Sequence, residues 1–172
     1  MPRKSSKVKF TRRVLGIDPG LASTGWGVLD DADGNICYVD HGVIITKPDR
    51  PRAERLFIIL QYIRSIIEKY KPTEAAIENL YFGKNVSSAI PVAEARGVIS
   101  AAAAENGIPL RELTPNAVKA GVVGSARADK KQVQEMVKII LGLEEIPKSD
   151  HAADALAAAI CAINSPSMIN GT

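Results

Sequence analysis

The pattern of the fold is set near the start of the chain, by Val14-Leu15-Gly16-Ile17-Asp18-Pro19-Gly20. A β-branched and leucine-rich run that ends in Asp-Pro-Gly predicts a short strand leading straight into a turn. A second apolar run, interrupted by two glycines, covers residues 24–29, and a third covers 36–45 after an Asp-Gly turn signal. Two hairpin-like connections in succession predict an antiparallel meander of three strands.

Beyond residue 50 the apolar residues change to helical spacing, and strands and helices then alternate. Thr114-Pro115 is typical of a helix start, and a glycine-marked loop at 121–128 follows that short helix. We predict longer helices at 52–70, 87–105, 129–141 and 149–163, and further strands at 74–78 and 108–113. This order predicts one α/β domain with a mixed five-stranded sheet flanked by helices, at residues 14–164. Residues 1–13 and 165–172 are expected to be a basic, disordered tail and a frayed C-terminal tail.

Length and composition fit a cytoplasmic protein with an ordinary core. A chain of 172 residues buries roughly 70% of its unfolded surface, so folding needs no disulfide or structural metal. Its two cysteines form no CxxC or zinc pattern, which favours a reducing compartment. No apolar stretch reaches the ~18 residues of a membrane span, and no apolar segment follows the basic N-terminus as in a secretory signal.

The positive charge is concentrated at the N-terminus. Six basic residues precede the first acid, Asp18, and since the whole chain carries +3, the remainder carries −3. These residues suit either a solvated tail or an arm that contacts phosphates, so net charge alone does not establish nucleic-acid binding.

Two acids stand where predicted strands end. Asp18 is followed closely by Gly20, which lets a metal or phosphate approach the backbone, although Asp-Pro-Gly is also common turn chemistry. Glu78 ends the apolar run Ala-Ala-Ile, and an acid there is costly unless it is paired, metal-bound or at the rim of the sheet.

The last predicted helix carries the polar group Asp150, His151 and Asp154. Residues three or four apart share a helix face, so Asp150 and His151 can both lie on the side of Asp154. Asp150 also suits an N-cap or first-turn acid and His151 an exposed first-turn residue, whereas Asp154 lies too far inside the helix to cap it.

Together, Asp18, Glu78 and Asp154 predict a site for one or two hard cations. Carboxylates and an imidazole suit Mg²⁺ or Mn²⁺, and the imidazole favours Mn²⁺. A two-metal site hydrolyses phosphodiesters without a serine or cysteine nucleophile, and the sequence offers no plausible catalytic triad.

Two further groups of residues suit contacts with DNA. Tyr81, Phe82 and Lys84 follow Glu78 in a polar loop, where aromatic rings can stack on bases or plug the core. Basic residues flank the glycine-marked loop and suit phosphate contacts or a solvated face: Lys119, Arg127, Lys130 and Lys131. Residues 121–130 do not have the spacing of a nucleotide-binding P-loop.

These motifs, in this order and spacing, resemble the RuvC family of Holliday-junction resolvases, which have an RNase H-like fold. The resemblance covers residues 14–163 and includes Leu-Gly-Ile-Asp-Pro-Gly, Thr-Gly-Trp-Gly-Val, Ala-Ile-Glu-Asn and Ala-Ala-Asp-Ala-Leu-Ala. It implies a homodimer that nicks four-way DNA junctions symmetrically, with a branch-migration motor as partner. The helix at 87–105 would contribute to the dimer interface.

The resemblance also implies a metal-binding tetrad of Asp18, Glu78, His151 and Asp154. Tyr81 would then lie near the strand crossover, and Lys119 and Lys130 would contact DNA. The family more often has a carboxylate at the position of His151, so this chain is expected either to prefer Mn²⁺ or to use His151 to orient water.

Three other functions stay open from the sequence alone. A junction-binding module would bind without cleaving, and a related RNase H-like nuclease would cut another branched substrate. An actin-like ATPase also starts with an Asp-x-Gly turn, but it needs a second phosphate loop and a much longer chain.

Overall fold

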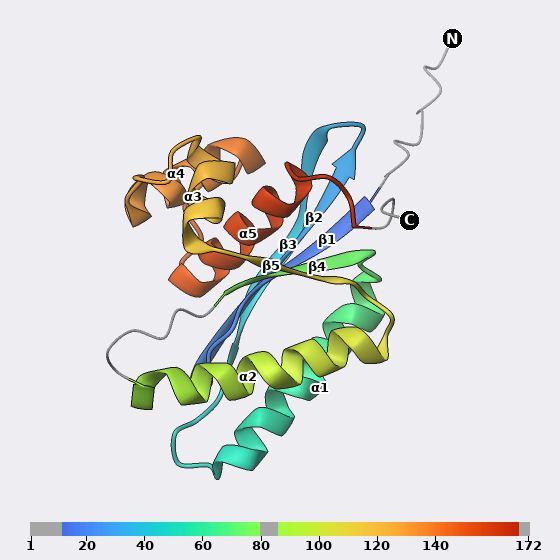
Figure 1. The fold of residues 1–172 in the computed structure, drawn as a ribbon, viewed down its shortest axis with the longest axis vertical. Coiled ribbons are helices and arrows are strands. Elements are labelled where there is room, and N and C mark those ends of the chain that lie inside the picture. The colour runs from blue at the N-terminus through green and yellow to red at the C-terminus, as the bar shows by residue number, and fades with distance from the viewer. Residues whose placement is uncertain (1–11, 80–85, 169–172) are drawn as a thin grey trace.

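The computed structural model describes residues 12–79 and 86–168, which form a five-stranded sheet between two layers of helices (Figure 1). The strands are β1 Arg12–Asp18, β2 Ser23–Ala32, β3 Asn35–Ile45, β4 Glu74–Glu78 and β5 Leu110–Leu113. The helices are α1 Arg52–Tyr70, α2 Val86–Glu105, α3 Pro115–Val123, α4 Lys130–Leu141 and α5 Asp150–Ile163.

The sheet is mixed, as predicted, with the strand order β3-β2-β1-β4-β5. Strands β1, β2 and β3 pair antiparallel and form the predicted meander. Strands β4 and β5 pair parallel, β4 against β1 and β5 against β4. Because parallel neighbours need a crossover, a helix precedes each of them in the chain, α1 before β4 and α2 before β5.

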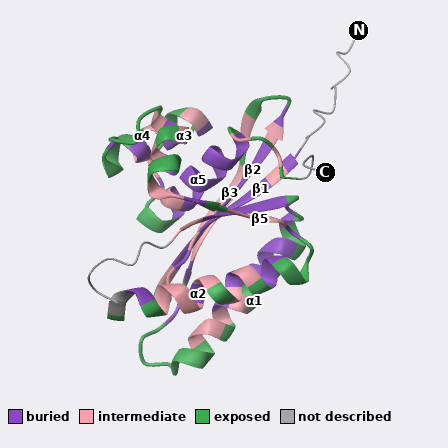
Figure 2. Ribbon diagram, viewed as in Figure 1, coloured by how far each residue is buried: buried purple, intermediate pink, exposed green. Residues whose placement is uncertain are grey.

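Each face of the sheet has its own core, because successive residues of a strand point to opposite faces. Leu15 and Ile17 belong to the cluster under α1 and α2. Val14 belongs to the cluster under α3, α4 and α5. Helix α5 lies directly on the sheet and is buried along most of its length (Figure 2).

Glycines in the strands let α5 lie close to the sheet. A Cβ at Gly16 would overlap the backbone of Ala155, and a Cβ at Gly25 would overlap the backbone carbonyl of His151. The glycines that interrupt the apolar runs therefore mark where the helix backbone approaches the strand backbone.

Several boundaries differ from the sequence-based predictions, and β2, predicted at 24–29, runs from Ser23 to Ala32. Strand β1 begins at Arg12, whereas the sequence placed residues 12 and 13 in the basic tail; Arg12 is buried and lies 3.2 Å from the Glu74 carboxylate. Helix α3 extends to Val123, so Gly121 is helical and not part of a loop; a Cβ there would lie 2.8 Å from the Cys161 sulfur of α5. Strand β5 begins two residues later than predicted, at Leu110. None of the helices in residues 12–79 and 86–168 has the length and apolarity of a bilayer-spanning segment.

Candidate active site

Asp18 and Glu78 end two neighbouring parallel strands, β1 and β4. The register pairs Ile17 with Ile77, so the next residues, Asp18 and Glu78, stand at the same level at the carboxyl edge of the sheet. Both side chains are partly buried. Two strands thus bring together carboxylates that are 60 positions apart in the sequence.

Helix α5 adds His151 and Asp154 to this edge. Asp18 pairs across the sheet with Gly25, and the His151 carbonyl packs on Gly25, so the first turn of α5 lies beside Asp18. The His151 Nδ1 lies 2.7 Å from Asp18 Oδ2. Asp154 follows one turn later and is 29% exposed.

The side chains of Asp18, Glu78 and Asp154 form a carboxylate cluster, and the negative charge of one disfavours the ionisation of another. Burial and the nearby charges of Asp18 and Asp154 raise the pKa of Glu78 from 4.5 to about 7, although Lys119 and Lys130 oppose the shift. Burial also raises the pKa of Asp18, and the hydrogen bond to His151 partly offsets this rise. The pKa of Asp154 is raised by burial too, and Lys130 opposes that shift. A group of desolvated, like-charged carboxylates favours an added cation.

Lys130, the first residue of α4, places a positive charge beside Asp154. Its Nζ lies 3.2 Å from Asp150 Oδ2 and 3.3 Å from Asp154 Oδ2. Asp150 turns towards α4, where its Oδ1 accepts a hydrogen bond of 2.9 Å from Gln134, while His151 turns towards Asp18. Of the two candidates in the first turn of α5, His151 is therefore the one that contacts the carboxylate cluster.

A pocket of about 170 Å³ opens beside the carboxylates. Its lining includes Glu78 and Asp154 together with Lys119 of α3 and Lys130 of α4. Arg127, also predicted to contact DNA, is exposed between α3 and α4. The other three residues predicted to contact DNA lie outside the described residues: Tyr81, Phe82 and Lys84.

The donor set fits hard divalent cations, since it consists mainly of carboxylate oxygens. No side chain in the described part of the chain forms a hydrogen bond or ion pair with Glu78, whereas Asp18 and Asp154 have His151 and Lys130. Over that same part, no three His, Cys, Asp or Glu side chains are arranged so that they could hold a metal ion as they stand. A cation would therefore replace the existing contacts of Asp18 and Asp154.

Gln134 of α4 also belongs to this group, although no sequence motif marks it. Gln134 lies four residues after Lys130, which places both on one face of a helix. This spacing can be read from the sequence, but it indicates a contact with Asp150 only once Asp150 is known to face α4.

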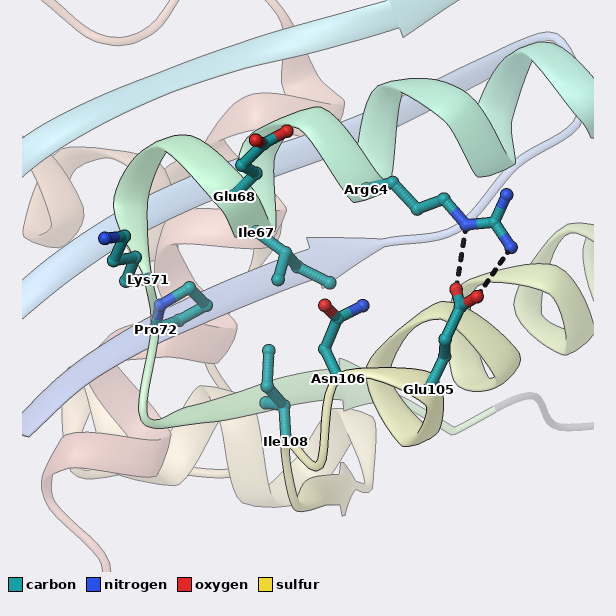
Figure 3. A pocket seen from close by; sticks show the side chains of 8 residues that line it. All are labelled: Arg64, Ile67, Glu68, Lys71, Pro72, Glu105, Asn106 and Ile108. Carbon is teal, nitrogen blue, oxygen red and sulfur yellow. Dashed lines mark hydrogen bonds and ion pairs between the residues drawn. The ribbon is translucent and has the colours of Figure 1, made fainter.

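A second pocket, of about 780 Å³, lies at the opposite end of the molecule. It is lined by Lys71 and Pro72 before β4 and by Ile108 before β5, so it belongs to the amino edge of these strands. Figure 3 shows the Arg64 guanidinium of α1 joined to the Glu105 carboxylate of α2 across it, at 2.8 and 3.0 Å. This paired contact ties the two helices together and pairs two of the four charged residues that line the pocket.

The sequence matches the family model described as crossover junction endodeoxyribonuclease RuvC over residues 14–162. A protein of that name from Treponema denticola is 51% identical over 160 residues, which cover 93% of this chain and 90% of the relative. Another, from Chloroflexus aurantiacus, is 50% identical over 149 residues, covering 87% and 91%.

Two solved structures are similar to this one. The Thermus thermophilus RuvC in complex with a Holliday junction substrate superposes with a TM-score of 0.83 at 34% identity, over 88% of this chain and 92% of that one. The yeast mitochondrial Holliday junction resolvase Ydc2 gives a TM-score of 0.63 at 18% identity, over 92% and 82%, and supports the fold alone.

Proposed function

Because the chain belongs to the RuvC family of crossover junction endodeoxyribonucleases, we propose that it nicks four-way DNA junctions at the carboxyl edge of its RNase H-like sheet. The observation that carries this proposal is the meeting of Asp18, Glu78 and Asp154 from β1, β4 and α5, where their charges repel one another. Such a cluster has little structural value, since repulsion between buried charges destabilises the fold.

Asp18, Glu78 and Asp154 are the side chains that would hold divalent cations, Mg²⁺ or Mn²⁺ and two per site, with His151 beside Asp18. When bound, such ions polarise the phosphodiester and lower the pKa of the attacking water. Asp18 ends β1, which pairs with β4, and it contacts His151 of α5, so it would help to hold the cations from between the other two elements. His151 either joins the ligand set through Nδ1 or keeps its hydrogen bond to Asp18 and orients water.

Basic side chains beside the cluster would hold the DNA backbone. Lys119 and Lys130 line the pocket next to Glu78 and Asp154, and Arg127 extends this positive surface between α3 and α4. Cations at these places suit phosphates on both sides of the scissile bond. The resemblance to the family assigns Tyr81, which lies outside the described residues, a place near the strand crossover, where an aromatic ring can stack on bases.

A homodimer suits a substrate with two-fold character, because a two-fold dimer presents two identical sites to it. Helix α2 is apolar on nearly all sides, yet part of its surface is exposed, including Ile90, Gly97, Ala101 and Ala104. An apolar helix of this kind favours a second copy as its cover. The free thiols of Cys37 and Cys161 suit the cytoplasm, where a branch-migration motor would be a further partner.

Asp18→Asn tests the proposed function directly. The substitution removes one charge from the cluster and keeps the shape of the side chain, so nicking should fall below detection. Binding to a synthetic four-way junction should persist, because the lost charge does not contact DNA. The assay compares Mg²⁺ with Mn²⁺ and maps the cuts.

Paired symmetric nicks by the unsubstituted protein support the proposal, and full cleavage by Asp18→Asn contradicts the site. A mobility shift without cuts would indicate a junction-binding module. Equal or faster cutting of another branched or RNA-containing substrate would indicate a different nuclease of the same fold.

A further inference from the structure

Lys130 is fixed at both ends of its side chain. Its backbone begins α4, whose N-cap Asp129 and third residue Gln132 form a capping box. Its ammonium lies between the carboxylates of Asp150 and Asp154, at 3.2 and 3.3 Å. An exposed lysine otherwise samples many rotamers, so this arrangement restricts where the charge stands.

Asp150 is itself held in place by a neutral partner. Its Oδ1 accepts a 2.9 Å hydrogen bond from the Gln134 amide, and its Oδ2 contacts Lys130. Gln134 and Lys130 are four residues apart, on the same face of α4. One carboxylate at the start of α5 thus reaches two points of α4 that are one turn apart.

The contact contributes little to folding. Asp150 is 66% exposed and Lys130 is 54% exposed, and ion pairs between exposed side chains add little to stability. Asp154 alone already gives Lys130 an opposite charge at the site. The second carboxylate therefore changes the position of the ammonium more than it changes the stability of the protein.

We propose that Asp150, oriented by Gln134, is a positioning residue that keeps the Lys130 ammonium beside Asp154 for contact with a DNA phosphate. The proposal rests on the proposed function, in which Asp154 holds a cation. Once that carboxylate binds a cation, like charges repel and Lys130 loses it as a partner. Asp150 is then the contact that retains the ammonium at the edge of the site.

The kinetic test uses Asp150→Asn and Gln134→Met, each alone and combined with Lys130→Gln. Single-turnover nicking of a synthetic four-way junction in Mn²⁺ should slow by about two- to fivefold in either single variant, the range that exposed ion pairs produce. Junction affinity in EDTA should stay the same or increase in Asp150→Asn, because a negative charge is removed. In the Lys130→Gln background, neither substitution should slow nicking further.

Nuclear magnetic resonance of the metal-free protein gives a readout that needs no activity. The side-chain ammonium signal of Lys130, assigned by its absence in Lys130→Gln, should shift in Gln134→Met, which changes no charge. Glu135→Gln is the matched control for Asp150→Asn, since it also removes one negative charge. Glu135 lies on α4 and, in the described chain, forms no ion pair with Lys130.

Two results would overturn the positioning role. One is an effect of Asp150→Asn on nicking that persists at full size without Lys130, which would indicate bulk charge. The other is a Lys130 signal that stays unchanged in Gln134→Met. If the unsubstituted protein cuts no junction, the proposed function fails, while the resonance experiment still tests the contact itself.

Discussion

At the scale of single residues, the three carboxylates differ in the partners that they already have. Asp18 contacts His151 and Asp154 contacts Lys130. Glu78 has no such contact with a described residue, and its pKa rises to about 7 because burial and two neighbouring charges oppose its ionisation. Glu78 is thus the carboxylate that an added cation would stabilise most.

This difference predicts how pH affects the stability of the metal-free protein. A carboxyl group whose pKa is raised from 4.5 to about 7 holds its proton longer in the folded state than in the unfolded state. The free energy of unfolding that it contributes is therefore fully present below pH 4.5 and is lost as the pH rises to about 7. Urea unfolding at pH 5, 6, 7 and 8 should show this decline in the unsubstituted protein and a smaller one in Glu78→Gln.

Mn²⁺ provides the control for that experiment. A cation bound at Glu78 favours the ionised form, so saturating Mn²⁺ should raise the unfolding temperature more at pH 8 than at pH 5. The assignment would be wrong if the unsubstituted protein and Glu78→Gln lost stability equally over this pH range.

At the scale of elements, the site depends on how closely α5 approaches β2. Gly25→Ala would place a methyl group against the His151 carbonyl, and backbone there cannot move without shifting the first turn of α5. We expect a loss of about 1–3 kcal/mol in stability. Nicking should fall further than this loss explains, because His151 lies on the displaced turn and Asp154 follows it in the same helix.

Gly27→Ala is the matched control for that prediction. It lies two residues along the same strand on the same face, but its new Cβ would meet the Leu156 side chain, at 2.6 and 2.8 Å, and the nearest helix backbone atom is 3.3 Å away. Thermal unfolding and single-turnover nicking of the two variants should separate them clearly. Equal nicking by Gly25→Ala and Gly27→Ala would show that the backbone contact does not position the site.

The helices and strands could be predicted from the sequence. The role of a residue could not be predicted where it depends on a packing partner that is distant in the sequence. The meander and the Thr114 N-cap follow from local chemistry and are confirmed, and the helix predicted at 129–141 is observed at Lys130–Leu141. Gly121 looked like a loop residue, because nothing local reveals that Cys161 packs against it. Strand ends marked Asp18 and Glu78 as candidates, whereas the contact of Gln134 with Asp150 depends on the angle between α4 and α5.

At the scale of the whole molecule, the two edges of the sheet have different roles. The carboxyl edge gathers the charges that repel one another. The amino edge pairs its charges: Arg12 contacts the fully buried Glu74, and Glu74 accepts a hydrogen bond of 3.2 Å from the Met168 backbone. The chain after α5 thus covers part of the amino edge, and the carboxylate cluster lies at the opposite edge, where the first turn of α5 begins.

A two-fold assembly predicts a specific effect at the exposed side of α2. Ile90, Gly97, Ala101 and Ala104 recur at helical spacing, so an arginine at the third position would place an unpaired charge within the proposed interface. Ala101→Arg should weaken the dimer by at least about thirtyfold, the effect of a loss of about 2 kcal/mol. Sedimentation velocity measures this directly.

Ile139→Arg is the control. Ile139 lies on α4, across the sheet from α2, and is 67% exposed, so an arginine there should leave the dimer intact. Junction cutting provides the second readout, because a monomer with an intact carboxylate cluster should still make single nicks while losing the paired ones. A dimer that survives Ala101→Arg would place the interface elsewhere on the molecule.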